Sequence, residues 1–165
     1  MAQRVFYSFH YQLDNWRVQQ VMKMGAIEGQ PLLSSQAWED VAEGGDAAIQ
    51  EWIDGQMKGK SCNVVLIGSH TAGRKWVEYE IKKAWGDKKG VLGIYIHRLL
   101  DSNGNSASKG SNPFSRFTLN DGKVQFDSVV PVYDPSGLTS TDVYNTIKNY
   151  IDNWVEYAIS VRGQW

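Results

Sequence analysis

The sequence predicts an α/β fold in which a central parallel sheet is covered by helices on both faces. Short apolar, β-branched runs alternate with stretches of helical apolar spacing, and one unit at residues 62–85 shows both. Val64–Ile67 is a run typical of a strand buried on both faces. A polar, Gly-containing break follows at Gly68–Gly73, and Val77, Ile81 and Ala84 then repeat at a helical period.

The elements expected before this unit follow the same alternation. In order, they are a strand at Arg4–Phe9, a helix from about Asn15 to Met24 capped by Asp14 or Asn15, a short strand at Pro31–Leu33, a loop or partial helix at Ser34–Glu43, and a helix at Asp46–Met57.

The elements expected after it complete the sheet. They are a turn at Gly86–Gly90, a strand at Val91–Ile96, a Gly/Ser/Asn-rich loop at Asp101–Gly110, an excursion at Phe114–Phe126 with a hairpin around Asn120–Gly122, an edge strand at Val129–Tyr133, and a long helix opened by a capping box at Thr139–Asp142. Alternation of this kind predicts one α/β domain spanning residues 1–165, with the part after about residue 114 fitting the pattern less closely.

Composition excludes several classes of function. The net charge of −1 gives no electrostatic reason to expect a nucleic-acid or membrane partner. The single cysteine, Cys62, cannot form an internal disulfide and is interpreted as a core residue. The N-terminus does not resemble a signal peptide, and no apolar run approaches the ~20 residues that span a bilayer, so we expect a cytoplasmic protein.

Several common site motifs are absent from the sequence. It contains no G-x-G-x-x-G after the first strand, no phosphate-binding G-x-x-x-x-G-K-[ST], no G-x-S-x-G and no Cys/His cluster with metal-ligand spacing. We therefore expect no metal site. Of the histidines, His97 is interpreted as structural, whereas His10 and His70 follow the ends of two predicted strands and could reach one crevice.

Trp76 and Glu80 form a candidate site on the helix of the 62–85 unit. At about 100° per residue, Glu80 lies roughly 60° from Val77, at the margin of the core-facing stripe, and Trp76 lies one turn earlier on the same side. Ligands of open α/β sheets bind at the ends of strands, where such a helix begins. The alternative is that Trp76 covers the core and Glu80 pairs with Arg74, Lys82 or Lys83 at the surface.

Two segments resemble the sequence boxes of TIR domains, which have a flavodoxin-like fold. RVFYSFHYQ at residues 4–12 is similar to the first box, and LIGSHTAGRKWVEYEI at residues 66–81 is similar to a later box with W-x-x-x-E. AWED at residues 37–40 and SKGSNPF at residues 108–114 resemble the TIR-like ThsB proteins of the Thoeris anti-phage system.

The resemblance implies an enzyme that cleaves the nicotinamide–ribose bond of NAD and makes a cyclic ADP-ribose isomer. NAD is then a substrate, so no cofactor is expected; further expectations are a separate effector activated by the product, a phage-derived trigger and a homo-oligomer. By the same resemblance, Glu80 is expected to be catalytic, and the substrate-binding residues are expected to be Ser8, Phe9, His10, Trp38, Asp40, Ser69 and Trp76. Val77 stands where many TIR domains have Cys.

This chemistry suits a site with one carboxylate. The nicotinamide of NAD is cationic and leaves as a neutral molecule, so it needs no general acid, unlike the leaving group of an ordinary glycoside. A half-buried carboxylate can stabilise the positive charge that develops on the ribose.

Two other classes of function stay open at this stage. One is a non-catalytic TIR-like adaptor, suggested by the many aromatic residues, Tyr157 and Trp165 among them. The other is a flavodoxin-like nucleotide binder or receiver domain, although a receiver would need an acidic cluster after its first strand, where this chain has SFHYQ.

Overall fold

The central sheet has five parallel strands. The computed structural model describes residues 3–33, 35–135, 137 and 139–165. The strand order is β2-β1-β3-β4-β7, and every neighbouring pair is parallel. The strands are β1 (Arg4–Ser8), β2 (Glu28–Gly29), β3 (Cys62–Ile67), β4 (Gly90–Tyr95) and β7 (Val132–Tyr133). The predicted α/β fold with a parallel sheet is confirmed.

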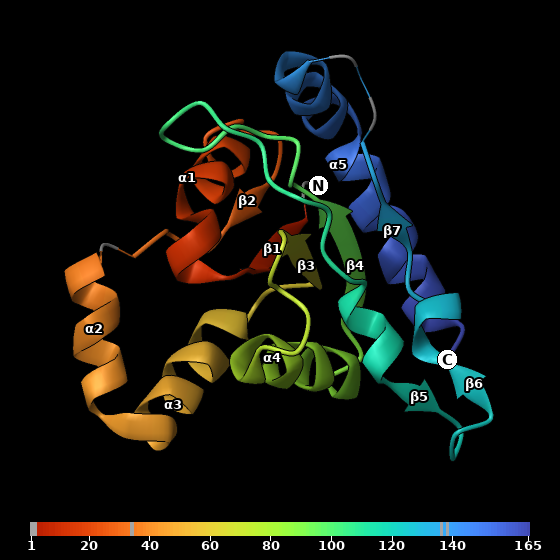
Figure 1. Ribbon diagram of the computed structural model, residues 1–165. Helices are drawn as coiled ribbons and strands as arrows, with labels where there is room; N and C mark the ends of the chain where they lie inside the picture. The colour runs from red at the N-terminus through yellow and green to blue at the C-terminus, as the bar shows by residue number, and fades with distance from the viewer. Residues whose placement is uncertain (1–2, 34, 136, 138) are drawn as a thin grey trace.

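Helices cover both faces of this sheet. One face packs against α1 (Tyr11–Met22) and α5 (Ser140–Gly163), and the other against α3 (Gly45–Met57) and α4 (Lys75–Gly86). In Figure 1, α3 and α4 lie below the strands, and α2 (Ser35–Glu43) stands at the outer side of α3. The expected loop or partial helix is therefore a helix from Ser35 onward; Ser34 lies outside the described residues.

The central strands are buried along their whole length. Every residue of β3 and β4 is buried, as the apolar runs predicted, because helices cover both sides. Cys62 is fully buried in the core, so its predicted structural role is confirmed, and burial raises the pKa of its thiol above the ordinary range.

The helix α1 begins four residues earlier than expected. Its N-cap is His10, whose Nδ1 accepts a hydrogen bond from the Leu13 N–H at 3.3 Å. The predicted caps Asp14 and Asn15 are wrong, because Asp14 is buried inside the helix and pairs with Arg17. A local capping pattern could not reveal this tertiary contact.

The short strand predicted at Pro31–Leu33 is also misplaced. The strand β2 lies at Glu28–Gly29, and the side chain of Gln30 then replaces further strand pairing. Its Oε1 accepts from the Tyr7 N–H, and its Nε2 donates to the Tyr7 carbonyl, both at 2.8 Å. Because Pro31 has no N–H to donate, the backbone could not continue this ladder. The segment after Gln30 is free to line a cavity.

The segment 113–128 packs onto the α3 and α4 side of the sheet. Its short elements are η1 (Pro113–Arg116), β5 (Thr118–Leu119), β6 (Val124–Gln125) and η2 (Phe126–Ser128). Phe114 and Phe126 are buried there, with ring centroids 5.8 Å apart. The strands β5 and β6 form the predicted antiparallel hairpin, and the expected edge strand is β7, which begins after Pro131.

The last helix confirms its predicted start. The Thr139 hydroxyl accepts from the Asp142 N–H, and the Asp142 carboxylate accepts from the Thr139 N–H, both at 3.2 Å. No helix among the described residues is long and apolar enough to cross a bilayer.

Gly90→Ala should destabilise the fold by about 2 kcal/mol, because an added Cβ would overpack a fixed backbone. That Cβ would lie 2.8 Å from the Ile159 nitrogen and 3.0 Å from the Ala158 carbonyl carbon, both in the backbone of α5. Urea denaturation measures the change in the free energy of unfolding. Gly86→Ala is the matched control, because its Cβ would meet open space; equal stability of the two variants would contradict this packing.

Candidate functional site

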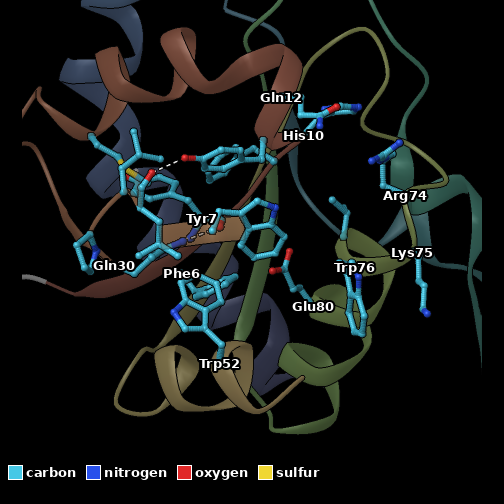
Figure 2. A pocket seen from close by; sticks show the side chains of 18 of the residues that line it. Phe6, Tyr7, His10, Gln12, Gln30, Trp52, Arg74, Lys75, Trp76 and Glu80 are labelled. Atoms are coloured by element: carbon cyan, nitrogen blue, oxygen red, sulfur yellow. Dashed lines mark hydrogen bonds between the residues drawn. The ribbon is translucent and has the colours of Figure 1, made fainter. Parts of the chain in front are cut away.

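A cavity of about 500 Å³ opens at the carboxyl end of β1, between α1, α3 and the first turns of α4. This volume is within the range of small-molecule sites, and the position is the one where ligands bind in open α/β sheets. Figure 2 shows its side chains converging from several elements. The lining residues include Phe9, His10, Tyr11, Gln30, Trp38, Trp52, Arg74, Trp76 and Glu80.

Glu80 is the buried acid of this cavity. Its side chain extends from the second turn of α4, is 8% exposed, and lies beside Trp76 in Figure 2. The predicted position at the margin of the core is therefore confirmed. The alternative of a surface ion pair with Lys83 fails, because Lys83 pairs with Asp54 and Asp87 instead.

Burial changes the protonation of Glu80. It raises the pKa of the carboxyl from 4.5 to about 8, although a hydrogen bond with Ser8 favours the carboxylate and opposes the rise. At pH 7 this carboxyl group is therefore mainly neutral before substrate binds. A cationic ligand would favour its ionisation.

Ser8 lies behind Glu80, at the end of β1. It is 1% exposed, and its hydroxyl oxygen accepts a hydrogen bond from Asn63 Nδ2 at 2.8 Å. Asn63 also donates to the Phe6 carbonyl at 3.1 Å. Because the Ser8 oxygen is occupied as an acceptor, its single proton is available to donate to Glu80. Ser8 was predicted to contact substrate, but the structure places it against the acid rather than on the cavity wall.

Aromatic rings form the wall opposite α4. Phe9 and Tyr11 stack with centroids 6.0 Å apart, and Tyr11 and Trp38 stack at 5.9 Å. Trp52 contacts Trp38 edge to face, and the Tyr11 hydroxyl donates to the Leu33 carbonyl. These contacts hold flat apolar surfaces beside Glu80. Such surfaces suit a ligand with planar rings.

His10 is both the cap of α1 and part of the cavity lining. Because its Nδ1 accepts the Leu13 N–H, the proton of the neutral ring is assigned to Nε2. Burial lowers the pKa of this imidazole, and the nearby charge of Arg74 lowers it further. His10 is therefore a neutral group at pH 7.

The structure brings five of the eight predicted site residues to the cavity wall: Phe9, His10, Trp38, Trp76 and Glu80.

Asp40 and Ser69 are not among the residues that line the cavity, and their contact with substrate stays a prediction. Asp40 is exposed on α2, two residues after Trp38, so it points about 200° away from that ring. Ser69 bonds to the exposed His70 at 2.8 Å. The loop before η1 covers Ser69 closely, since a Cβ on Gly110 would lie 2.9 Å from the Ser69 carbonyl oxygen. His70 is not among the residues that line the cavity, although its charge contributes to lowering the pKa of His10.

Sequence reasoning missed Asn63, Tyr11, Trp52 and Arg74. A signal existed for Asn63, since an amide inside the apolar run CNVVLI must find buried partners. Tyr11 reaches the cavity from the start of α1, Trp52 through the packing of α2 on α3, and Arg74 from the cap of α4. Sequence spacing does not specify these three positions. Among the described residues, no group of His, Cys, Asp and Glu could hold a metal ion.

Comparison with known proteins identifies relatives of this chain. The family model described as the TIR-like domain of the Thoeris protein ThsB matches residues 6–101. A protein of Bacillus cereus (strain MSX-D12), named "Putative cyclic ADP-D-ribose synthase ThsB1", is 39% identical over 119 residues. The match covers 69% of this chain and 62% of that relative.

Proposed function

The chain belongs to the ThsB family of TIR-like domains, and from this membership we propose that it cleaves the nicotinamide–ribose bond of NAD and forms a cyclic ADP-ribose isomer. The observation that most supports this proposal is the buried acid, Glu80, in a cavity walled by stacked aromatic rings. The name of the Bacillus cereus relative agrees with it. The part played in anti-phage defence, through a separate effector, belongs to the same proposal.

The reaction needs one carboxylate and a wall that positions the dinucleotide. As the bond between ribose C1′ and the pyridinium nitrogen breaks, its electron pair passes to nitrogen, and nicotinamide leaves as a neutral molecule. The ribose becomes an oxocarbenium-like cation, which the Glu80 carboxylate stabilises at close range in a site of low polarity. A hydroxyl or adenine nitrogen of the same molecule then attacks C1′ with loss of a proton where cyclisation requires it. Attack by water gives ADP-ribose.

The pH dependence of kcat/KM should follow the ionisation of Glu80. The free enzyme reacts as the carboxylate, and burial raises the pKa of that group to about 8. We therefore expect kcat/KM for NAD to rise with pH and reach half of its maximum near pH 8. The cationic nicotinamide ring favours the carboxylate, so the midpoint for kcat should lie at lower pH. A kcat/KM that is flat between pH 6 and 9 would contradict this assignment of the acid.

Product analysis tests the proposed function directly. The purified chain is incubated with NAD, and nicotinamide and the adenine-containing product are separated by mass. The cyclic product has the mass of ADP-ribose less one water. If the purified chain is silent, the same analysis of phage-challenged cells that express this chain or its Glu80→Gln variant tests the requirement for a trigger. The absence of any Glu80-dependent nicotinamide release in those cells would overturn the proposal.

The surface also supports a second candidate, an assembly adaptor. Tyr150, Tyr157 and Trp165 are 52%, 58% and 48% exposed on or just after α5, as expected for an interaction surface. An adaptor would act without cleaving NAD. Unchanged biological activity of a Glu80→Gln variant would favour the adaptor over the enzyme.

A further inference from the structure

Arg74 is the cation at the cavity that has no acidic partner in the part of the chain that the structure describes. It is the N-cap of α4 and lines the cavity together with Lys75 and Trp76. Two other cations surround the same helix start, and both are paired: Lys75 with Asp46, and Arg116 with Glu78, whose Oε1 lies 2.6 Å from Nε. Within the described residues, the Arg74 guanidinium makes no ion pair.

The His10 imidazole neither neutralises the charge of Arg74 nor adds a second positive charge. His10 is the titratable side chain that faces Arg74 across the cavity, and both burial and Arg74 lower its pKa. The cavity therefore presents a fixed positive charge at Arg74 and a titratable acid at Glu80. In Figure 2, Arg74 lies above Trp76 and Glu80, on the side where His10 and Gln12 also lie.

The spacing of these two groups suits one particular kind of ligand. Glu80 follows the N-cap Arg74 by six residues, so their backbone positions lie about 9 Å apart along the helix axis, and both side chains line the cavity. In a nicotinamide dinucleotide, one ribose separates the cationic ring from the negatively charged diphosphate. A guanidinium binds phosphate oxygens by two parallel hydrogen bonds, and the positive end of α4 adds to that attraction.

We propose that Arg74 binds the diphosphate of NAD and thereby fixes the direction of the dinucleotide, with its cationic ring at Glu80. This inference rests on the proposed function, because it assumes that the cavity holds NAD. It assigns Arg74 as the residue that selects phosphate-bearing substrates over the phosphate-free nucleoside. It also places the adenosine half on the far side of Arg74 from Glu80.

Equilibrium binding to a Glu80→Gln chain, which prevents turnover, tests the role of Arg74. Calorimetry with ADP-ribose and with adenosine separates recognition of the diphosphate from recognition of the ring. Arg74→Met should weaken ADP-ribose binding roughly 10- to 100-fold, with adenosine binding unchanged within about twofold. Arg74→Lys should be intermediate, because a point charge remains but the paired geometry is lost.

Arg116→Met is the matched control, because Arg116 adjoins the same helix start but is paired with Glu78 and does not line the cavity. It should bind ADP-ribose like its parent. Added salt should weaken ADP-ribose binding to the parent more than to the Arg74→Met chain. Parent-like affinity of Arg74→Met, an equal loss for adenosine, or no binding of ADP-ribose to the parent would overturn the inference.

Kinetics on the chain with Glu80 intact separate this inference from the proposed function. Arg74→Met should lower kcat/KM for NAD roughly 10- to 100-fold and leave that for nicotinamide riboside unchanged. A similar loss for both substrates would overturn the role of Arg74 while leaving NAD cleavage established. Should no cleavage occur at all, the proposed function fails, and the binding comparison with ADP-ribose still decides what Arg74 recognises.

Discussion

Glu80→Gln should lower kcat for nicotinamide release from NAD by on the order of 10³-fold, the cost of removing one group that stabilises transition-state charge. The neutral amide has nearly the shape of the protonated acid and can keep the hydrogen bond from Ser8. It cannot offer a negative charge to the oxocarbenium-like ribose. The loss is measured as the rate of nicotinamide release at saturating NAD, monitored by chromatography.

Glu78→Gln is the control for this variant. Glu78 lies on the same helix, but its carboxylate pairs with Arg116 near the surface. It should retain full turnover. Parent-like turnover of Glu80→Gln, or an equal loss in Glu78→Gln, would remove Glu80 from the mechanism.

Stability provides an independent check on Glu80→Gln. Because the carboxyl has its pKa raised from 4.5 to about 8, the folded protein keeps a proton that the unfolded chain releases. The parent therefore loses stability as pH rises through this window, by up to about 1.4 kcal/mol per pH unit. The variant has no ionisable group at this position and does not lose this stability. Its melting temperature should therefore rise relative to that of the parent between pH 5 and 8. A constant difference would mean that Glu80 is not buried as a neutral acid.

Arg17→Met should destabilise the fold by about 3 kcal/mol, the effect expected when one partner of a buried charge pair is removed. Arg17 is 4% exposed, and its Nη1 lies 3.3 Å from Asp14 Oδ1. It also donates to the carbonyls of Leu99 and Asn105, at 2.8 and 2.9 Å. The substitution leaves Asp14 buried without its cation and releases the loop after β4 from α1. Urea denaturation at pH 7 measures the loss.

Arg98→Met is the matched control for Arg17→Met. Arg98 is exposed, and its one described hydrogen bond is a 3.5 Å contact with the Pro135 carbonyl. Its replacement should change the free energy of unfolding by less than about 0.5 kcal/mol. If the two variants were equally stable, the buried network of Arg17 would have no net value to the fold.

Local patterns in the sequence predicted much of the fold. The strands β1, β3 and β4 and the helices α3, α4 and α5 lie where apolar periodicity placed them, because one buried stripe or strand is enough to identify each. The hairpin and the capping box also follow from short-range chemistry. The errors at α1 and β2 arose from tertiary partners: Arg17 for Asp14, and the Tyr7 backbone for Gln30.

The candidate site, like the fold, was predicted from the sequence only in part. By itself, the sequence determined that Trp76 and Glu80 share one side of a helix at a strand end, since 3.6 residues per turn fixes that relation. Only the tertiary structure decided that Asn63 and Ser8 support the acid, that Trp38 reaches the cavity while Asp40 turns away, and that Arg74 stands unpaired among the described residues. These relations join residues distant in the chain, and the desolvation that raises the pKa of Glu80 exists only once the helices and sheet have packed around it.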